Sequence, residues 1–294
     1  MGKYVNPFTD VGFKIIFGSE LSKDMLVHFL NELLRGEYEI ADLTLLDKED
    51  RGDNIRDRGV IYDIHCHTRD GKRIIVEMQN RWHSHFLDRS LYYVSRAISR
   101  QAERLGTERD SAARYGEGYK LSAVYGVFLM NFKERDLEPK FRTDTLVADR
   151  DTGRAVNANF RQVFLQFPYF TRELVDCKSL FDKWIYVLKN MHSWDRMPSA
   201  LKDQVFQRLA RLAEVANLSE SDRVAYDKAL DQYRVDQILR HDDYMEGVRK
   251  GRQEGELTGV KKVALQMIKG GLPLDAVARY TGLSPEEIRC AQEK

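Results

Sequence analysis

The pattern of hydrophobic and polar positions divides the chain into three parts, with boundaries near residue 40 and near residue 170. Apolar residues at 21–35 recur at spacings of one, three and four before Gly36, which predicts an amphipathic helix. Extended segments rich in β-branched residues follow at 40–46, 60–68 and 73–79. The last two flank the turn sequence Arg69-Asp70-Gly71-Lys72, and we therefore expect a hairpin.

The middle of the chain alternates between the spacing typical of helices and the spacing typical of strands. A helical stripe covers residues 86–105, and the apolar run 120–132 is typical of a central strand buried on both faces. Residues 143–157 predict a hairpin around 149–153, and 160–167 predict one more strand.

Almost everything after residue 170 has helical spacing. The predicted helices cover 180–191, 200–217 and 222–248. The charged, glycine-punctuated stretch 246–259 is expected to be a frayed or extended connector, and 273–292 to form helix, turn and helix. The pattern therefore predicts an α/β core over residues 1–195 and an all-helical C-terminal region over 196–294.

Composition narrows the class of protein. The 294 residues are 43% apolar, with 47 Lys and Arg against 46 Asp and Glu, so a sizeable core is expected. We find no apolar run long enough for a membrane span and no secretory leader in the first residues. Three scattered cysteines make no disulfide framework. We expect a soluble protein of a reducing compartment, the cytoplasm, with no membrane partner.

Candidate chemistry lies in the predicted hairpin, where Asp63 is followed by Glu77 and Gln79. Glu77 and Gln79 share one face of their strand because side chains alternate. A three-residue turn over 69–71 with Gly71 in the left-handed conformation would set Asp63 opposite Glu77. A two-residue turn would send the two carboxylates to opposite faces, and glycine at the third position favours the first register.

Two carboxylates on adjacent strands suit a hard cation such as Mg²⁺ or Mn²⁺. Such an ion can polarise a phosphodiester and lower the pKa of a bound water. The alternative is that Asp63 and Glu77 are only the polar face of a half-exposed hairpin.

The spacing Asp-x13-Glu-x-Gln after an N-terminal helix resembles the PD-(D/E)xK nuclease superfamily, with Gln79 where most members have Lys. With the N-terminal string Pro7, Asp10, Phe13, Lys14 and Phe17, it is similar to the Rpn family of recombination-promoting nucleases and transposases. Two further segments agree with this family. The first predicted helix ends with Asn31-Glu32-Leu33-Leu34, and Gly118-Tyr119 precedes a predicted strand. The resemblance implies a restriction-endonuclease-like mixed sheet flanked by helices.

The resemblance also implies site roles. Asp63 and Glu77 would bind the metal, and Gln79 would stand where the superfamily lysine orients or activates the attacking water. A neutral amide cannot supply positive charge, so Lys14 is considered as a replacement cation. Alternatively, Asp10 and Lys14, four residues apart, form a plain intrahelical pair.

Two further groups of side chains, four arginines and four histidines, could bind ligands. Arg89, Arg96, Arg100 and Arg104 fall on one helix face, either as a stripe for DNA phosphates or as an ordinary solvated face. Four histidines could in principle bind zinc, but their spacing is not that of a structural zinc site. They are His65, His67, His83 and His85.

The C-terminal 274–288 stretch resembles a helix-turn-helix, with Gly282 in the turn and Ser284 as the cap. Its second helix begins with Glu286 and Glu287, which repel phosphate, so a packing or dimerisation hairpin is preferred. The sequence thus predicts a metal-dependent DNA endonuclease, with DNA and a second copy of the chain as partners. The alternative is a DNA-binding or assembly factor that retains the nuclease fold without efficient catalysis.

Overall fold

The computed structural model describes residues 2–46, 49–50, 60–107 and 121–292. The chain divides into two compact units, 1–230 and 231–294. Residues 196–230 thus share a unit with the sheet, and the sequence-derived division at residue 195 stays a prediction. Gly118-Tyr119 lies outside the described residues.

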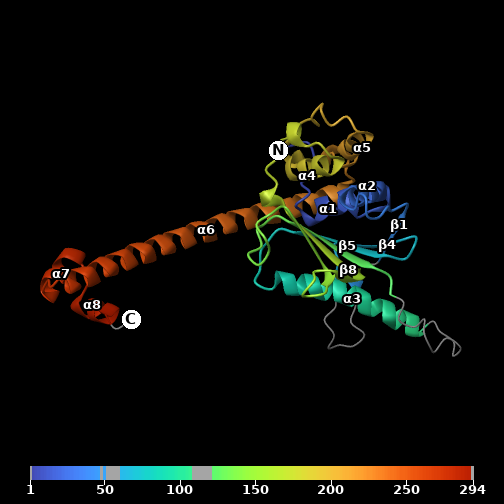
Figure 1. Cartoon of the computed structure of the whole chain (residues 1–294). Coiled ribbons are helices and arrows are strands. Elements are labelled where there is room, and N and C mark those ends of the chain that lie inside the picture. The colour runs from blue at the N-terminus through green and yellow to red at the C-terminus, as the bar shows by residue number, and fades with distance from the viewer. Residues whose placement is uncertain (1, 47–48, 51–59, 108–120, 293–294) are drawn as a thin grey trace. The chain divides into compact units, whose positions relative to one another are not determined.

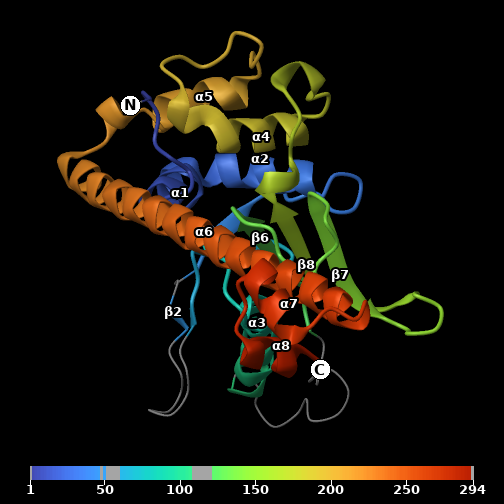
Figure 2. The same cartoon turned by 90° about the vertical axis from the view of Figure 1, so that its left-hand side faces the viewer.

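A six-stranded mixed sheet forms the centre of the first unit, in the order β1-β4-β5-β6-β8-β7. The strands β5, β6 and β8 run parallel to one another, and the remaining pairs are antiparallel. The bounds are β1 Leu43–Leu45, β4 Ile64–Thr68, β5 Arg73–Gln79, β6 Val124–Met130, β7 Arg142–Ala148 and β8 Ala155–Gln166. A separate two-stranded sheet joins β2 (Glu49–Asp50) to β3 (Val60–Ile61). Figure 2 shows β6, β8 and β7 side by side.

Helices cover both faces of the large sheet (Figure 1). On one face lie α1 (Asp10–Phe17), α2 (Lys23–Leu33), α4 (Leu180–Asn190) and α5 (Gln204–Leu212), and on the other lies α3 (Phe86–Thr107). Short 3₁₀ turns connect these elements. They are η1 Glu20–Ser22, η2 Phe167–Tyr169, η3 Leu174–Asp176, η4 Met191–Ser193 and η5 Val215–Asn217.

Each face of the sheet has an apolar layer. On the α3 side, Val94 and Ala97 pack with Ile75, Phe128 and Phe164 of the strands. On the other side, aromatic rings from four helices meet, with ring centroids 5.3–6.0 Å apart. They are Phe17, Phe29, Trp184 and Phe206. The mixed sheet flanked by helices confirms the predicted α/β fold class.

One strand prediction needs correction. The predicted hairpin at 143–157 and strand at 160–167 are β7 and a single long strand, β8, which spans Ala155–Gln166. Register shifts between Leu146 and Ala148 let the short strand follow the long one. At these shifts β8 has extra residues that lack a partner in β7, but β8 itself continues. The sequence pattern therefore suggested a break between two strands where the structure has one strand.

The second unit contains most of α6 (Glu220–Lys269), a continuous helix of 50 residues, together with α7 (Leu274–Thr281) and α8 (Pro285–Gln292). The expectation of a connector at 246–259 is therefore wrong. Ion pairs four residues apart, Lys250–Glu246 and Arg252–Glu256, support the helix through its glycines.

The terminal helix, turn and helix are confirmed. Ala264, Val277, Leu283 and Ile288 form a small buried cluster. Gly282 adopts φ +71° at the end of α7, which a residue with a side chain adopts only with strain. No helix among the described residues is both long and apolar enough to cross a membrane.

Candidate active site

The turn between β4 and β5 sets the geometry of the two acids. Gly71 has φ +86°, and the Thr68 amide donates to the Lys72 carbonyl at 2.8 Å, so the loop is the three-residue turn 69–71. Ile64 then pairs with Val76 and His65 with Ile75. The predicted register is confirmed, and it brings Asp63, just before β4, opposite Glu77.

The side chains of Asp63 and Glu77 each accept a hydrogen bond from the backbone of the opposite segment of the hairpin. The Asp63 amide donates to Glu77 Oε1 at 3.0 Å, and the Met78 amide donates to Asp63 Oδ2 at 2.8 Å. Glu77 is only 1% exposed. The two carboxylates therefore lie next to each other, with Glu77 buried and Asp63 half-buried, and each holds the opposite segment of the hairpin through a backbone hydrogen bond.

Burial changes the protonation of both acids. Burial, with the neighbouring Asp63 charge as the second cause, raises the pKa of Glu77 to about 8. Burial also raises the pKa of Asp63, and the charge of Asp10 adds to this. A pair of carboxylates that resists ionisation in this way gains from a cation placed between them.

Gln79 and Asn80 extend the site along β5. Gln79 Nε2 donates to Glu77 Oε2 at 3.2 Å, so the amide contacts the acid directly. The next residue, Asn80, donates from its side chain to the Phe8 carbonyl. This bond ties the end of β5 to the segment before α1. This bond could not be predicted from the sequence, because Asn80 and Phe8 are 72 positions apart.

The N-terminal string divides into core and surface residues. Phe13 and Phe17 are buried in the aromatic layer, with ring centroids 5.4 Å apart. Lys14 Nζ donates to Asp10 Oδ2 at 2.7 Å within α1, which is the plain intrahelical pair. Both charges also act on Asp63, since Asp10 raises its pKa and Lys14 lowers it. The pair therefore lies beside the acids.

α3 adds a cation that sequence analysis had placed in a DNA-binding stripe. Arg89 lowers the pKa of both Asp63 and Glu77, and its Nε donates to the Tyr93 hydroxyl at 2.9 Å. The four arginines do not share one environment. Arg89 is exposed, Arg96 and Arg100 are half-buried, and the side chain of Arg104 lies outside the described residues. Packing of α3 against the sheet brings Arg89 close enough for its charge to act on both acids, a placement that helical spacing alone could not show.

The donor set suits a divalent cation of the hard type. Within the described ranges, no group of three or more His, Cys, Asp and Glu side chains could hold a metal ion, which gives no support to a zinc site. Mg²⁺ needs fewer protein ligands, since it commonly takes one or two carboxylates and completes its shell with water and substrate phosphate. Asp63 and Glu77 supply those two carboxylates.

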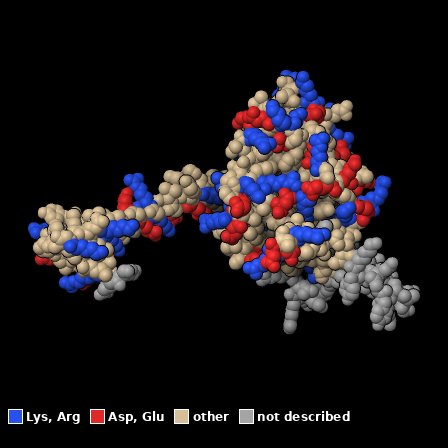
Figure 3. Space-filling view, viewed as in Figure 1, with Lys and Arg blue, Asp and Glu red and all other residues tan. Residues whose placement is uncertain are grey.

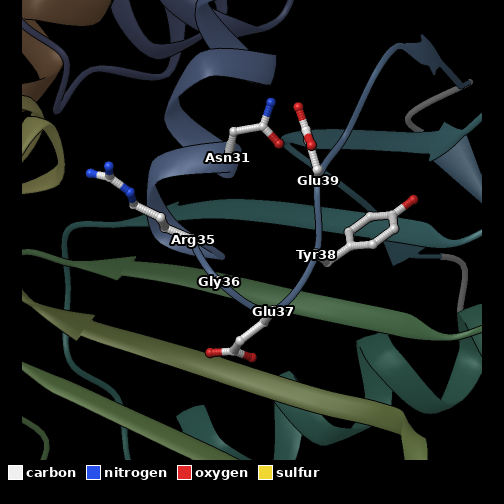
Figure 4. Close-up of a pocket in the computed structure, with 6 residues that line it drawn as sticks. All are labelled: Asn31, Arg35, Gly36, Glu37, Tyr38 and Glu39. Carbon is white, nitrogen blue, oxygen red and sulfur yellow. The ribbon is translucent and has the colours of Figure 1, made fainter.

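A pocket of about 440 Å³ lies elsewhere in the first unit, at the end of α2 (Figure 4). Asn31 shapes it by bonding both ways with Ile40, accepting from its amide at 2.7 Å and donating to its carbonyl at 3.0 Å. This contact explains why the helix-closing tetrapeptide matters for the fold. The lining residues are Asn31, Arg35, Gly36, Glu37, Tyr38 and Glu39.

The mixed sheet, the hairpin with two acids and the helices on both faces define a nuclease-like α/β domain. A family model described as PD-(D/E)XK nuclease family transposase matches residues 7–242, and the chain belongs to this family. A search of curated proteins and a search of solved structures find no match. Family membership indicates a nuclease-type function, and such nucleases typically use divalent metal ions.

Proposed function

We propose that this chain is a metal-dependent DNA endonuclease that hydrolyses phosphodiester bonds. The observation that carries the proposal is the pair of adjacent carboxylates, buried Glu77 and half-buried Asp63. Side-chain amides could accept the same two backbone bonds, so a purely structural hairpin would not need two acids where burial raises the pKa of one, Glu77, to about 8.

Asp63 and Glu77 would hold Mg²⁺ or Mn²⁺. When bound, the ion supplies positive charge to the phosphodiester and makes water a better nucleophile. Glu77 would hold the ion in its ionised form, and the raised pKa of about 8 is that of the acid pair alone. Gln79, bonded to Glu77, holds the attacking water with its amide but adds no charge.

Positive charge near the scissile phosphate would come from Arg89 and from Lys14. Arg89 is exposed beside the acids and carries a guanidinium, which suits phosphate oxygens. Lys14 is already paired with Asp10 and contributes less. Arg96, Arg100 and Arg104 would contact the DNA backbone without reading its sequence.

DNA is the proposed substrate, in the cytoplasm, and a second copy of the chain is the proposed partner. Cutting both strands of a duplex usually requires two active sites. A homodimer would provide them.

The test uses purified full-length protein and supercoiled plasmid with Mg²⁺ or Mn²⁺. Wild type is expected to nick or linearise the plasmid, and a chelator to stop it. Asp63→Asn and Glu77→Gln should each reduce cleavage at least 100-fold without lowering the melting temperature, because each amide retains an oxygen acceptor.

Equal cleavage by wild type and both variants would indicate a contaminating nuclease. The absence of wild-type cleavage, combined with DNA binding, would instead favour the second function, a DNA-binding or assembly factor. The observation that favours this alternative is Gln79 at the position of the superfamily lysine.

A further inference from the structure

The middle of α6 has one face that differs between its two halves. In the first half, this face carries two large exposed side chains four residues apart, Tyr244 (67%) and Val248 (48%). In the second half, the same face carries Gly251, Gly255 and Gly259, four residues apart. In the part of the chain that the structure describes, no atom beyond the neighbouring backbone of the same helix lies within 4 Å of a Cβ built on any of these glycines.

Nothing within the helix explains the glycines. Glycine destabilises an exposed helix relative to alanine, and these three do not make room for any described part of their own chain. Small residues four apart allow another helix to approach closely. The large side chains and the glycines are thus complementary in shape, as knobs and holes.

Charge follows the same division. Residues 231–246 contain five acidic and two basic residues, whereas 247–269 contain six basic and two acidic residues. Figure 3 shows Lys and Arg side chains on the part of this helix nearest α7 and α8. Two such helices attract each other only when they run in opposite directions, since a parallel arrangement places like charges together.

We propose that α6 pairs antiparallel with α6 of a second copy of this chain. A register in which paired residue numbers sum to 499 sets Tyr244 over Gly255 and Val248 over Gly251 of the other copy. It also lays the acidic half of each helix along the basic half of the other. The inference assigns a surface to the homodimer proposed above and does not depend on nuclease activity.

The face is separate from the small apolar cluster of the second unit. Ala264 and Ile268 pack toward α7 and α8, more than a third of a turn from Gly255 and Gly259. Pairing through the glycine face therefore leaves the packing of α7 and α8 intact.

Cysteine cross-linking of the full-length chain tests both the surface and the direction. Cys290 is exposed and is first replaced by serine, whereas Cys66 and Cys177 are buried. Tyr244→Cys and Gly255→Cys are made separately, with tags of different size. An equimolar mixture is expected to form a disulfide-linked heterodimer under mild oxidation. Each variant alone should not cross-link, because its own copies lie about 16 Å apart along the pair.

Cross-links in each variant alone would show a parallel pair and overturn the proposal, as would the absence of any cross-link in the mixture. Sedimentation supplies a second measurement. Gly255→Leu should weaken dimerisation at least tenfold, and Gln253→Leu, exposed on the opposite side of the helix, should leave it unchanged. Neither change lowers helix propensity appreciably, so unfolding does not explain a difference. A monomeric wild type at tens of micromolar, or equal effects of the two leucines, would overturn the surface.

Discussion

Glu77 in the first unit and Glu287 in the second both have shifted pKa values, and the shifts have opposite signs. Burial raises the pKa of Glu77 to about 8. A hydrogen bond from the Ser284 amide, at 2.8 Å, lowers the pKa of Glu287. The first shift depends on strands brought together from distant sequence, and the second on a cap three residues away. The environment of Glu77 therefore depends on tertiary structure, whereas that of Glu287 depends on residues close to it in the sequence.

The two units should therefore differ most in how they respond to a lost core side chain. Phe17→Ala removes a fully buried ring from the aromatic layer and should destabilise the first unit by about 3–5 kcal/mol. Ile288→Ala removes one of only four buried side chains of the small cluster and should unfold α7 and α8 while the sheet persists. Hydrogen exchange followed by mass spectrometry, peptide by peptide, measures both. Loss of protection across the sheet in Ile288→Ala would contradict the division into units.

The pH dependence of stability gives a second, smaller contrast. The raised pKa of Glu77 stabilises the folded state below about pH 4.5, and this stabilisation is lost as the pH rises through about 8. Without metal, Glu77→Gln should therefore gain on the order of 3 kcal/mol over wild type between pH 5 and pH 9. Urea unfolding in the presence of a chelator measures it.

Glu287→Gln serves as the matched control. Its lowered pKa stabilises the folded state above about pH 4.5 and loses that contribution as the pH falls. The variant should therefore lose a little stability at neutral pH and nothing in acid. A pH profile for Glu77→Gln parallel to that of wild type would contradict the buried, proton-binding state of Glu77.

Within the first unit, Arg89 affects the protonation of both acids. Because its charge lowers the pKa of both acids, Arg89→Gln should raise the pKa of Glu77 further and move the acidic limb of the cleavage profile to higher pH. Cleavage at neutral pH should fall about tenfold, equivalent to about 1.4 kcal/mol. Tyr93→Phe removes only the hydroxyl that Arg89 contacts and should change cleavage little. Equal pH profiles for wild type and Arg89→Gln would remove Arg89 from the site.

The hairpin could be predicted because its register depends on local chemistry. Gly71 at the third turn position, with Glu77 and Gln79 two residues apart, was enough to bring Asp63 opposite Glu77. The capping box of Ser284 and Glu287 is equally local. In both places, residues within a few positions of each other decide the structure.

Other features depend on packing and were not visible in the sequence. The bond from Asn80 to Phe8 and the approach of Arg89 to the acids join distant residues across the sheet. The continuous α6 was missed for a different reason. Its glycines predicted a break, but ion pairs four residues apart and good helix formers between them outweigh the cost of each glycine.

The reciprocal bonds between the acids and the backbone limit how this chain could evolve. Asp63 and Glu77 each accept a hydrogen bond from the opposite strand, so substitution of either by an apolar residue leaves a buried amide without an acceptor. In a descendant without catalysis, alanine at either position would lower the stability of the fold, whereas asparagine or glutamine would not. Inactive descendants are therefore expected to keep a side-chain oxygen at both positions, and loss of activity would arise there through exchange of acid for amide.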